Sequence, residues 1–474
     1  MAVRRCLQIF AGASFTLSTV IWAGDAFAHA GDRGHVLLLP TGHYIFGGAI
    51  AVALTFLVLA LVPARPLDDL ARLRLRIGSL PTWPRLAASA LCFFLLVGLL
   101  VAGWFGSRDP LSNPLPLMVW TVFWVGLTLA QGVFGNIWWW INPWYAPWRI
   151  LSRVTGRREA PELPGRVGYW PAVALFAAFA WFELVYPAPD DPARLATVLA
   201  VYFVLNLFAA LTFGYEAWMR QGECLSVFLR MISRLAIVDG SRPVGKRRAI
   251  ALCLPGAKLA DAAPLPLSGV VFLLLALGSV SFDGLMRTFF WLGLNGINPL
   301  EFPGRTAVLW ISSYGLLLTA TILASAFFGA VALAARMSGN RAVADAAGAL
   351  VWSIIPISMA YHFSHYLAAL VINGQYALAA LSDPFATGAD LLGTVTFNVQ
   401  AGILMGADGA WLVWNLQAAA IIGGHLLAIL VAHVIALRLH GTGGAATRSQ
   451  LPLAILMVAY TVFGLWLLSS PTAG

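Results

Sequence analysis

Charged residues are scarce in this chain of 474 residues: Asp, Glu, Lys and Arg together make up 10%, whereas apolar residues make up 60%. The mean hydropathy is +0.82. Several apolar runs continue for about 20 residues, the length of helix that crosses roughly 30 Å of hydrocarbon. A soluble globular protein is therefore excluded. The composition predicts an all-α, polytopic transmembrane helix bundle.

Cysteine is rare, and the common nucleotide-binding motifs are missing. The four cysteines are scattered along the chain, so they imply no disulfide framework and no zinc or iron–sulfur cluster. The sequence contains no Walker loop, no dinucleotide-binding glycine motif between a strand and a helix, and no internal repeat. ATP-driven transport is thus unsupported.

The first residues have the pattern of a secretory signal peptide. Two arginines precede a short apolar stretch, and the A-F-A sequence that ends at Ala28 fits the small-x-small cleavage pattern. We predict a signal peptide over residues 1–28 and an extracytoplasmic segment over 29–43 that begins with His29. An uncleaved signal anchor is the alternative.

Ten transmembrane helices are expected after the signal peptide, and they form a single helical domain over 44–474. The apolar runs place them at 44–62, 86–105, 115–135, 168–187, 194–215, 266–283, 306–334, 343–373, 410–437 and 452–469.

The distribution of Lys and Arg predicts the orientation of these helices. Outside the signal peptide, the segments expected on the outer side hold only Arg33, Arg108, Arg194, Arg287 and Arg305 of the 29 basic residues. Because basic residues concentrate in cytoplasmic loops, the mature N-terminus is expected outside a bacterial cytoplasmic (inner) membrane. The net charge of +9 then reflects membrane topology, so the lipid bilayer is a predicted partner and nucleic acid is not.

Two loops are long enough to carry structure of their own. The cytoplasmic loop 216–265 contains CLSVFLRMISRLAIV, in which two arginines interrupt recurring apolar residues. This pattern predicts an amphipathic helix on the cytoplasmic leaflet. The outer loop 374–409 contains Asp383, Asp390 and Asp408 but no Lys or Arg, and it is expected to attract cations.

Four histidines lie within two apolar segments that flank this acidic loop. His362 and His365 are three residues apart, so they share one face of the eighth helix. His425 lies near the middle of the ninth helix, at a depth that can meet them. His433 is eight residues further inward, about 12 Å deeper. We predict one metal site formed by His362, His365 and His425, with His433 as a secondary candidate.

Three imidazole ligands and an open position suit a divalent ion, Zn or Cu, that activates a water molecule. Asp383 and Asp390 are the predicted catalytic bases. Tyr361 and Tyr366 could also orient the imidazoles or serve as base, and Gln375 and Gln417 are further polar candidates. Two alternatives stay open. Each histidine can make an interhelical hydrogen bond, or paired histidines can hold haem between helices.

A second group of histidines lies at the start of the mature chain. His29 would offer both its α-amine and its imidazole, the chelate known as a histidine brace, and His35 or His43 would complete a copper site. These three residues are secondary metal candidates.

Two acidic residues lie at the outer ends of predicted helices. Glu183, in WFELVYP, is either an interfacial acid or a proton-handling group. Asp283, in SFDGL, is assigned a structural role or a position above the histidines as an additional ligand.

The chain resembles a family of bacterial polytopic membrane proteins named fenitrothion hydrolase. The resemblance lies in the HA start, Pro40 and Tyr44, NPW at 142–144, SFDG at 281–284, PISMAYHFSHY at 356–366, SDPFATGADLLGT at 382–394 and GHLLAILVAH at 424–433. It implies hydrolysis of an organophosphorus triester, a small lipophilic substrate. A copper- or haem-binding membrane protein, in metal handling or electron transfer, is the alternative function.

Overall fold

The protein is described from a computed structural model. It covers residues 41–62, 64–154, 156, 164–240, 245–339, 342–394, 397–404, 406–441 and 443–473. The predicted signal peptide, His29 and His35 lie outside the described residues.

Ten segments in the described part of the chain are long and apolar enough to cross a membrane, which confirms the predicted number. Three of them consist of several consecutive helical elements. They are α2 (Thr41–Leu61), α4 (Pro84–Phe105), α5 (Pro114–Pro116) with η2 (Leu117–Leu127) and α6 (Thr128–Phe134), η3 (Gly165–Val167) with α9 (Trp170–Leu184), α10 (Pro192–Phe213), α14 (Leu267–Leu285), α16 (Leu309–Ser338), α17 (Val343–Leu350) with η5 (Val351–Ser353) and α18 (Ile354–Ser382), α19 (Ala407–His440) and α20 (Gly443–Ser469).

Shorter elements connect these segments. They are α3 (Ala64–Arg72), β1 (Arg74–Pro81), α7 (Trp138–Ile141), α8 (Tyr145–Val154), α11 (Tyr215–Gln221), α12 (Cys224–Ile232), β2 (Val238–Gly240), β3 (Arg247–Cys253), α13 (Ala257–Ala260), α15 (Phe289–Leu294), η4 (Pro299–Glu301) and η6 (Ala401–Leu404). The fold is the predicted all-α polytopic bundle, with one small sheet added.

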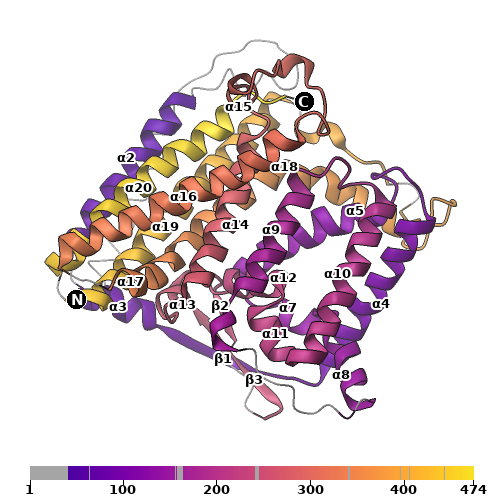
Figure 1. Cartoon of the computed structure of the whole chain (residues 1–474), viewed down its shortest axis with the longest axis horizontal. Coiled ribbons are helices and arrows are strands. Elements are labelled where there is room, and N and C mark those ends of the chain that lie inside the picture. The colour runs from indigo at the N-terminus through magenta and orange to yellow at the C-terminus, as the bar shows by residue number, and fades with distance from the viewer. Residues whose placement is uncertain are drawn as a thin grey trace.

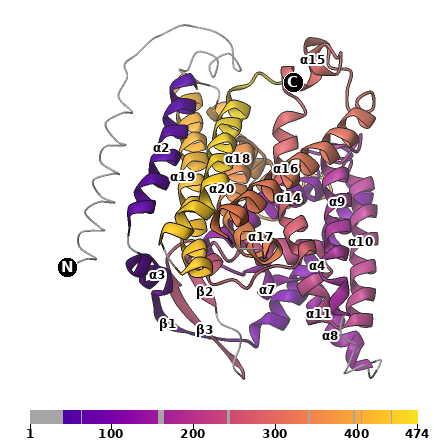
Figure 2. The same ribbon diagram turned by 60° about the vertical axis from the view of Figure 1, so that its left-hand side comes forward.

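The sheet joins two loops that are far apart in the sequence. Its strand order is β1-β3-β2, and both pairings are antiparallel. Since β1 belongs to the segment 63–85 and β3 to the segment 216–265, these two predicted loops lie on the same side of the bundle, where Figures 1 and 2 show the sheet beneath the helix ends. We call this face the sheet side.

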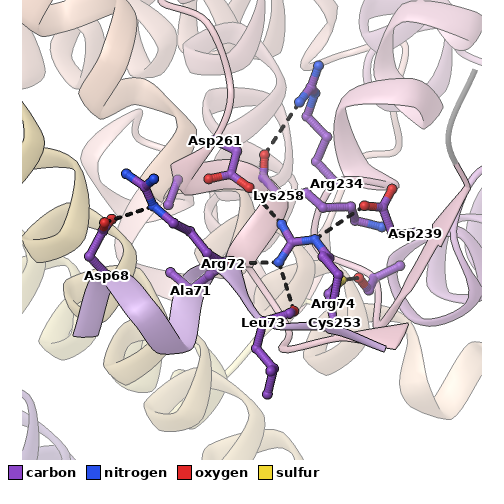
Figure 3. Close-up of polar contacts among 12 residues, drawn as sticks. Asp68, Ala71, Arg72, Leu73, Arg74, Arg234, Asp239, Cys253, Lys258 and Asp261 are labelled. Atoms are coloured by element: carbon purple, nitrogen blue, oxygen red, sulfur yellow. Dashed lines mark hydrogen bonds and ion pairs between the residues drawn. The ribbon is translucent and has the colours of Figure 1, made fainter. Parts of the chain in front are cut away.

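A cluster of ion pairs fastens the sheet to the helix ends (Figure 3). The guanidinium of Arg74, the first residue of β1, lies 3.3 Å from the carboxylate of Asp239 and 2.6 Å from that of Asp261, and it donates to the carbonyl of Ala71. Arg438, near the end of α19, lies 2.9 Å from the same Asp261. The cluster therefore connects α3, the sheet and α19.

Helix α12 occupies a different place from the one predicted. All of its residues except Arg230 are buried by protein, and the ring of Phe228 packs against Trp124 and Phe176. An amphipathic pattern shows that a helix has an apolar face, but either lipid or protein can cover that face. The predicted position on the leaflet surface is corrected accordingly: α12 is inserted beneath the transmembrane helices.

The two histidine-bearing helices pack closely along a glycine. Helix α18 packs against α19, α14 and η2. A β-carbon added at Gly424 of α19 would lie 2.5 Å from the β-carbon of Ala360 and 2.8 Å from the carbonyl oxygen of Pro356, both on α18. Position 424 therefore requires glycine because the neighbouring backbone leaves no space.

We predict that Gly424→Ala destabilises the protein, because overpacking a tight contact costs about 1–3 kcal/mol. The apparent unfolding temperature in detergent, measured by intrinsic fluorescence, should fall. Gly423→Ala is the matched control, since a β-carbon at Gly423 meets no atom within 4 Å. Equal unfolding temperatures for the two variants would contradict the close approach of α18 and α19.

Candidate functional site

Three helices bring two carboxyl groups and one phenol together on the side opposite the sheet. The hydroxyl of Tyr366 on α18 lies 3.0 Å from Oε1 of Glu183 and 2.7 Å from Oδ2 of Asp283. Glu183 is next to the last residue of α9, and Asp283 is two residues before the end of α14. Helix α14 packs against both α9 and α18, as Figure 1 shows.

The Tyr366 contacts imply a shared proton. A phenol has one proton to donate and lone pairs to accept with. Contact with both carboxyls is satisfied when the hydroxyl donates to one of them and accepts from the other in its protonated form. Asp283 has a second donor in His365, so we assign Asp283 as the carboxylate and Glu183 as the carboxylic acid.

His365 forms a dyad with Asp283. Its Nε2 lies 2.8 Å from Oδ2 of Asp283. A carboxylate only accepts, so Nε2 carries the proton and Nδ1 of the neutral imidazole keeps a free lone pair. The side chain of His365 is 32% exposed, whereas that of Asp283 is 14% exposed. The arrangement is therefore a buried acid that orients an accessible imidazole, which is the geometry of a general base.

His362 lies one turn before the dyad and faces a different partner. Its Nε2 donates to the carbonyl oxygen of Trp124 over 3.0 Å, and its ring meets those of Trp124 and Tyr366 edge to face. Trp124 lies in η2, an 11-residue π-helix, an unusual winding that recurs at functional sites. The hydrogen bond fixes the proton of His362 on Nε2.

A narrow cavity opens between these groups. Its polar wall is formed by Glu183, Asp283, His362 and Tyr366, and α12 contributes Phe228 to the apolar wall. The space is large enough for a water molecule. The correction to the position of α12 thus explains how the cavity is closed toward the sheet side.

Trp124 was missed in the sequence reasoning. Its indole Nε1, a donor only, is buried near the carboxyl of Glu183 and the hydroxyl of Tyr366 but makes no hydrogen bond of good geometry in the described part of the chain, and its side chain lines the cavity. One feature of the sequence could have indicated Trp124 as a functional residue. Interfacial belts place Trp at the ends of membrane spans, whereas Trp124 lies near the middle of the predicted span 115–135.

His425 and His433 lie apart from the dyad. His425 Nδ1 donates to the carbonyl of Ile421 over 2.8 Å, and its ring lies 6.1 Å from that of Tyr460. His433 Nδ1 bonds to the side-chain amide of Gln450. Among residues 41–473 as far as they are described, no three His, Cys, Asp or Glu side chains lie close enough together to hold a metal ion.

The structure therefore brings His362 and His365 to one site but does not add His425 to form a metal centre. The predicted Zn or Cu ion stays a prediction. The same holds for the copper site near the mature N-terminus. Of its three histidines only His43 is described, and it is exposed in the first turn of α2.

The two predicted bases lie far from the histidines. Helix α18 continues nine residues into the predicted outer loop, so Asp383 caps its end, about 27 Å along the helix from His365. Asp383 accepts from the backbone N–H groups of Thr387 and Gly388, and these hydrogen bonds, that of Thr387 first, hold its pKa below the ordinary value.

Asp390 has a similar role within the loop. Its Oδ1 accepts from the hydroxyl of Ser382 over 3.0 Å and from the backbone N–H of Thr394. Both aspartates therefore shape the loop that follows α18. The carboxyl groups that accompany the histidines are those of Asp283 and Glu183.

We predict that the infrared spectrum of the purified protein contains the C=O stretch of a protonated carboxyl group. The band should disappear in Glu183→Gln and shift in Tyr366→Phe, because the phenol is its hydrogen-bond acceptor. Tyr376→Phe, on the same helix, should leave the band unchanged, since Tyr376 packs against an apolar cluster. A band unaffected by Glu183→Gln would contradict the proton assignment.

Comparisons with known protein families, with characterised proteins and with solved structures find no match for this chain. The functional assignment accordingly rests on the geometry of this site and on the sequence motifs described above.

Proposed function

We propose that this protein is a membrane-embedded hydrolase that acts on a small lipophilic phosphotriester. The observation that carries the proposal is the His365–Asp283 contact of 2.8 Å beside a second carboxyl group, Glu183, at the wall of a cavity. The resemblance to fenitrothion hydrolase supports the choice of an organophosphorus ester as the substrate class.

The dyad supplies the base. Asp283 holds the Nε2 proton of His365, which leaves Nδ1 to accept a proton from water as the water oxygen bonds to phosphorus. The bond between phosphorus and the leaving oxygen breaks, and Glu183 donates its carboxyl proton to that oxygen. The first products are a phosphodiester acid and an alcohol or phenol, with His365 protonated and Glu183 ionised. The acidic proton of the diester then passes to the Glu183 carboxylate, so the final products are a phosphodiester anion and the alcohol or phenol, and atoms and charge balance with His365 protonated and Glu183 again in its acid form.

The surroundings favour this reaction. The indole N–H of Trp124 lines the same cavity, beside Glu183, and can donate a hydrogen bond to a water molecule held there. The rings of Phe176 and Phe228 on the opposite wall exclude bulk water, which strengthens such a hydrogen bond. The cavity has room for a water molecule but not for an ester, so the ester is assigned to the exposed side of His365, whose side chain is one-third exposed and open to approach from the bilayer.

The proposed location is the bacterial inner membrane, with the sheet side in the cytoplasm and the mature N-terminus outside. The strands place arginines at the sheet side, where Arg74, Arg76, Arg247 and Arg248 belong to β1 and β3. This is the distribution that the positive-inside rule associates with cytoplasmic loops. The active site then faces the outer leaflet.

A divalent Zn or Cu ion held by His362, His365 and His425 remains the predicted cofactor. It would supply an activated water molecule. Because the three side chains do not converge in the described part of the chain, the steps above are assigned to protein groups alone.

We predict that His365→Ala and Asp283→Asn each lower turnover of a phosphotriester that releases 4-nitrophenolate by about 10²-fold or more, because a positioned general base contributes that much. The assay is release of 4-nitrophenolate by protein reconstituted in lipid vesicles. His440→Ala is the control, since His440 ends α19 on the sheet side. Unchanged turnover in His365→Ala would reject the proposal.

His425→Ala separates this mechanism from the three-histidine metal site. If the dyad acts alone, turnover survives this substitution; if the metal site forms, the loss equals that in His365→Ala. Elemental analysis of the same preparations shows whether a stoichiometric metal leaves together with the activity.

A second candidate function is binding of copper or haem, and one observation favours it. The Nε2 atoms of His425 and His433 are buried and have no hydrogen-bond partner in the described part of the chain. For His425 the proton lies on Nδ1, so Nε2 carries a lone pair of the kind that copper or haem iron binds.

We predict that, if this second function holds, the purified protein shows a visible absorption band or bound copper that is lost in His425→Ala and kept in His365→Ala. If the protein is purified from cells supplied with copper and haem and is colourless and free of copper, the second function is rejected.

A further inference from the structure

Two arginines line a second small cavity next to the proposed active site. Arg287 follows the end of α14, and Arg305 precedes α16. Both line the same cavity, whose remaining wall includes Leu184, Phe302 and Ser312. Only five basic residues are expected on the outer side of the mature chain, and two of them line this one cavity.

The guanidinium of Arg305 and the backbone of Arg287 are held in place by hydrogen bonds. Nη1 of Arg305 donates to the carbonyl oxygen of Glu183 over 2.8 Å and to that of Tyr186 over 3.3 Å, at the carboxyl end of α9, where a cation is favoured by the helix dipole. The backbone carbonyl of Arg287 accepts from the N–H of Ala473 over 2.8 Å. Arg305 retains further N–H donors that these bonds do not use.

Neither arginine is neutralised by a close carboxylate. In the described part of the chain, no ion pair within 4 Å involves Arg287 or Arg305. Asp190, outside the active site, lies within electrostatic reach: burial raises its pKa, and the charges of Arg305 and Arg287 oppose that rise. Two half-buried guanidinium groups with donors to spare form the recognition pattern for a phosphate-type oxyanion.

The cavity adjoins the proposed active site. Leu184 lines both cavities, and Arg287 lies one helical turn beyond Asp283. Arg305 binds the carbonyl of Glu183, the residue to which the acid role was assigned. An anion formed at the dyad would therefore meet these arginines on its path to the outer side.

We propose that Arg287 and Arg305 form a binding site for a phosphodiester monoanion, with the hydroxyl of Ser312 as an additional donor. The identity of this ligand as the reaction product rests on the proposed function. The recognition of a phosphorus oxyanion by two guanidinium groups does not depend on that proposed function.

The test is isothermal titration of diethyl phosphate into the full-length protein in detergent, at low chloride. We expect one saturable site whose dissociation constant rises by about tenfold or more in Arg287→Gln, because a charge-assisted bidentate contact is lost. Arg287→Lys should restore part of the affinity. Arg108→Gln is the matched control, since Arg108 is an exposed outer arginine paired with Asp191 at 2.6 Å.

The outcomes separate the binding site from the hydrolase. Diester binding that is lost in Arg287→Gln, in a protein with no turnover, would support the site and reject the hydrolase. Turnover without diester binding, or equal binding by wild type and Arg287→Gln, would overturn the site. Inorganic phosphate that binds as tightly as the diester would overturn the assignment to a diester.

A lipid source for the same chemistry is tested in parallel. Phospholipid that copurifies with the wild type and is lost in Arg287→Gln, without diester binding, would assign the arginines to a lipid headgroup and overturn the proposed site for the soluble anion. Phospholipid content that is equal in the two proteins, together with diester binding, would support the proposal.

Discussion

Two carboxyl groups meet at one phenol in a part of the protein where water is scarce, and this contact constrains the rest of the structure. A buried charge without a partner is strongly unfavourable in a low-dielectric environment. Glu183 and Asp283 therefore have to share protons and donors, and Tyr366 and His365 provide them. Because the four residues come from α9, α14 and α18, satisfying them fixes how those three helices lie relative to one another.

The same requirement connects the site to the two arginines. Asp283 and Glu183 lie at helix ends that face the side opposite the sheet. Arg287 follows the end of α14, and Arg305 contacts the end of α9. The arginines place positive charge near a carboxylate that has to stay ionised, and they keep that charge outside the apolar core. One arrangement thus serves two purposes: it stabilises the carboxylate of Asp283, and it offers an anion a favourable route away from it.

Much of the fold follows from the sequence, and less of the site does. Hydropathy predicts all ten spans because length and polarity are local properties. Helical spacing predicts that His362 and His365 share one face, also a local property. The partners of these histidines come from helices that are far away in the sequence, and no local pattern reports which helix ends meet. Asp383 and Asp390 were predicted as bases from the loop that joins the two histidine-bearing helices, but α18 continues to Ser382 and places that loop far from His365.

The tight contact at Gly424 also explains why the histidines of α19 do not reach the His365–Asp283 dyad, although α19 packs against α18. Gly424 lies against the backbone of Pro356, six residues before His362. At the level of the histidine pair, α19 instead presents Gln417, which exchanges hydrogen bonds with Ser364. His425 is adjacent to Gly424, and its Nδ1 donates a hydrogen bond within its own helix, to the carbonyl oxygen of Ile421. Depth alone suggested that three imidazoles could converge. The close approach at Gly424 instead sets His425 opposite the start of α18, where its ring lies beside that of Tyr460.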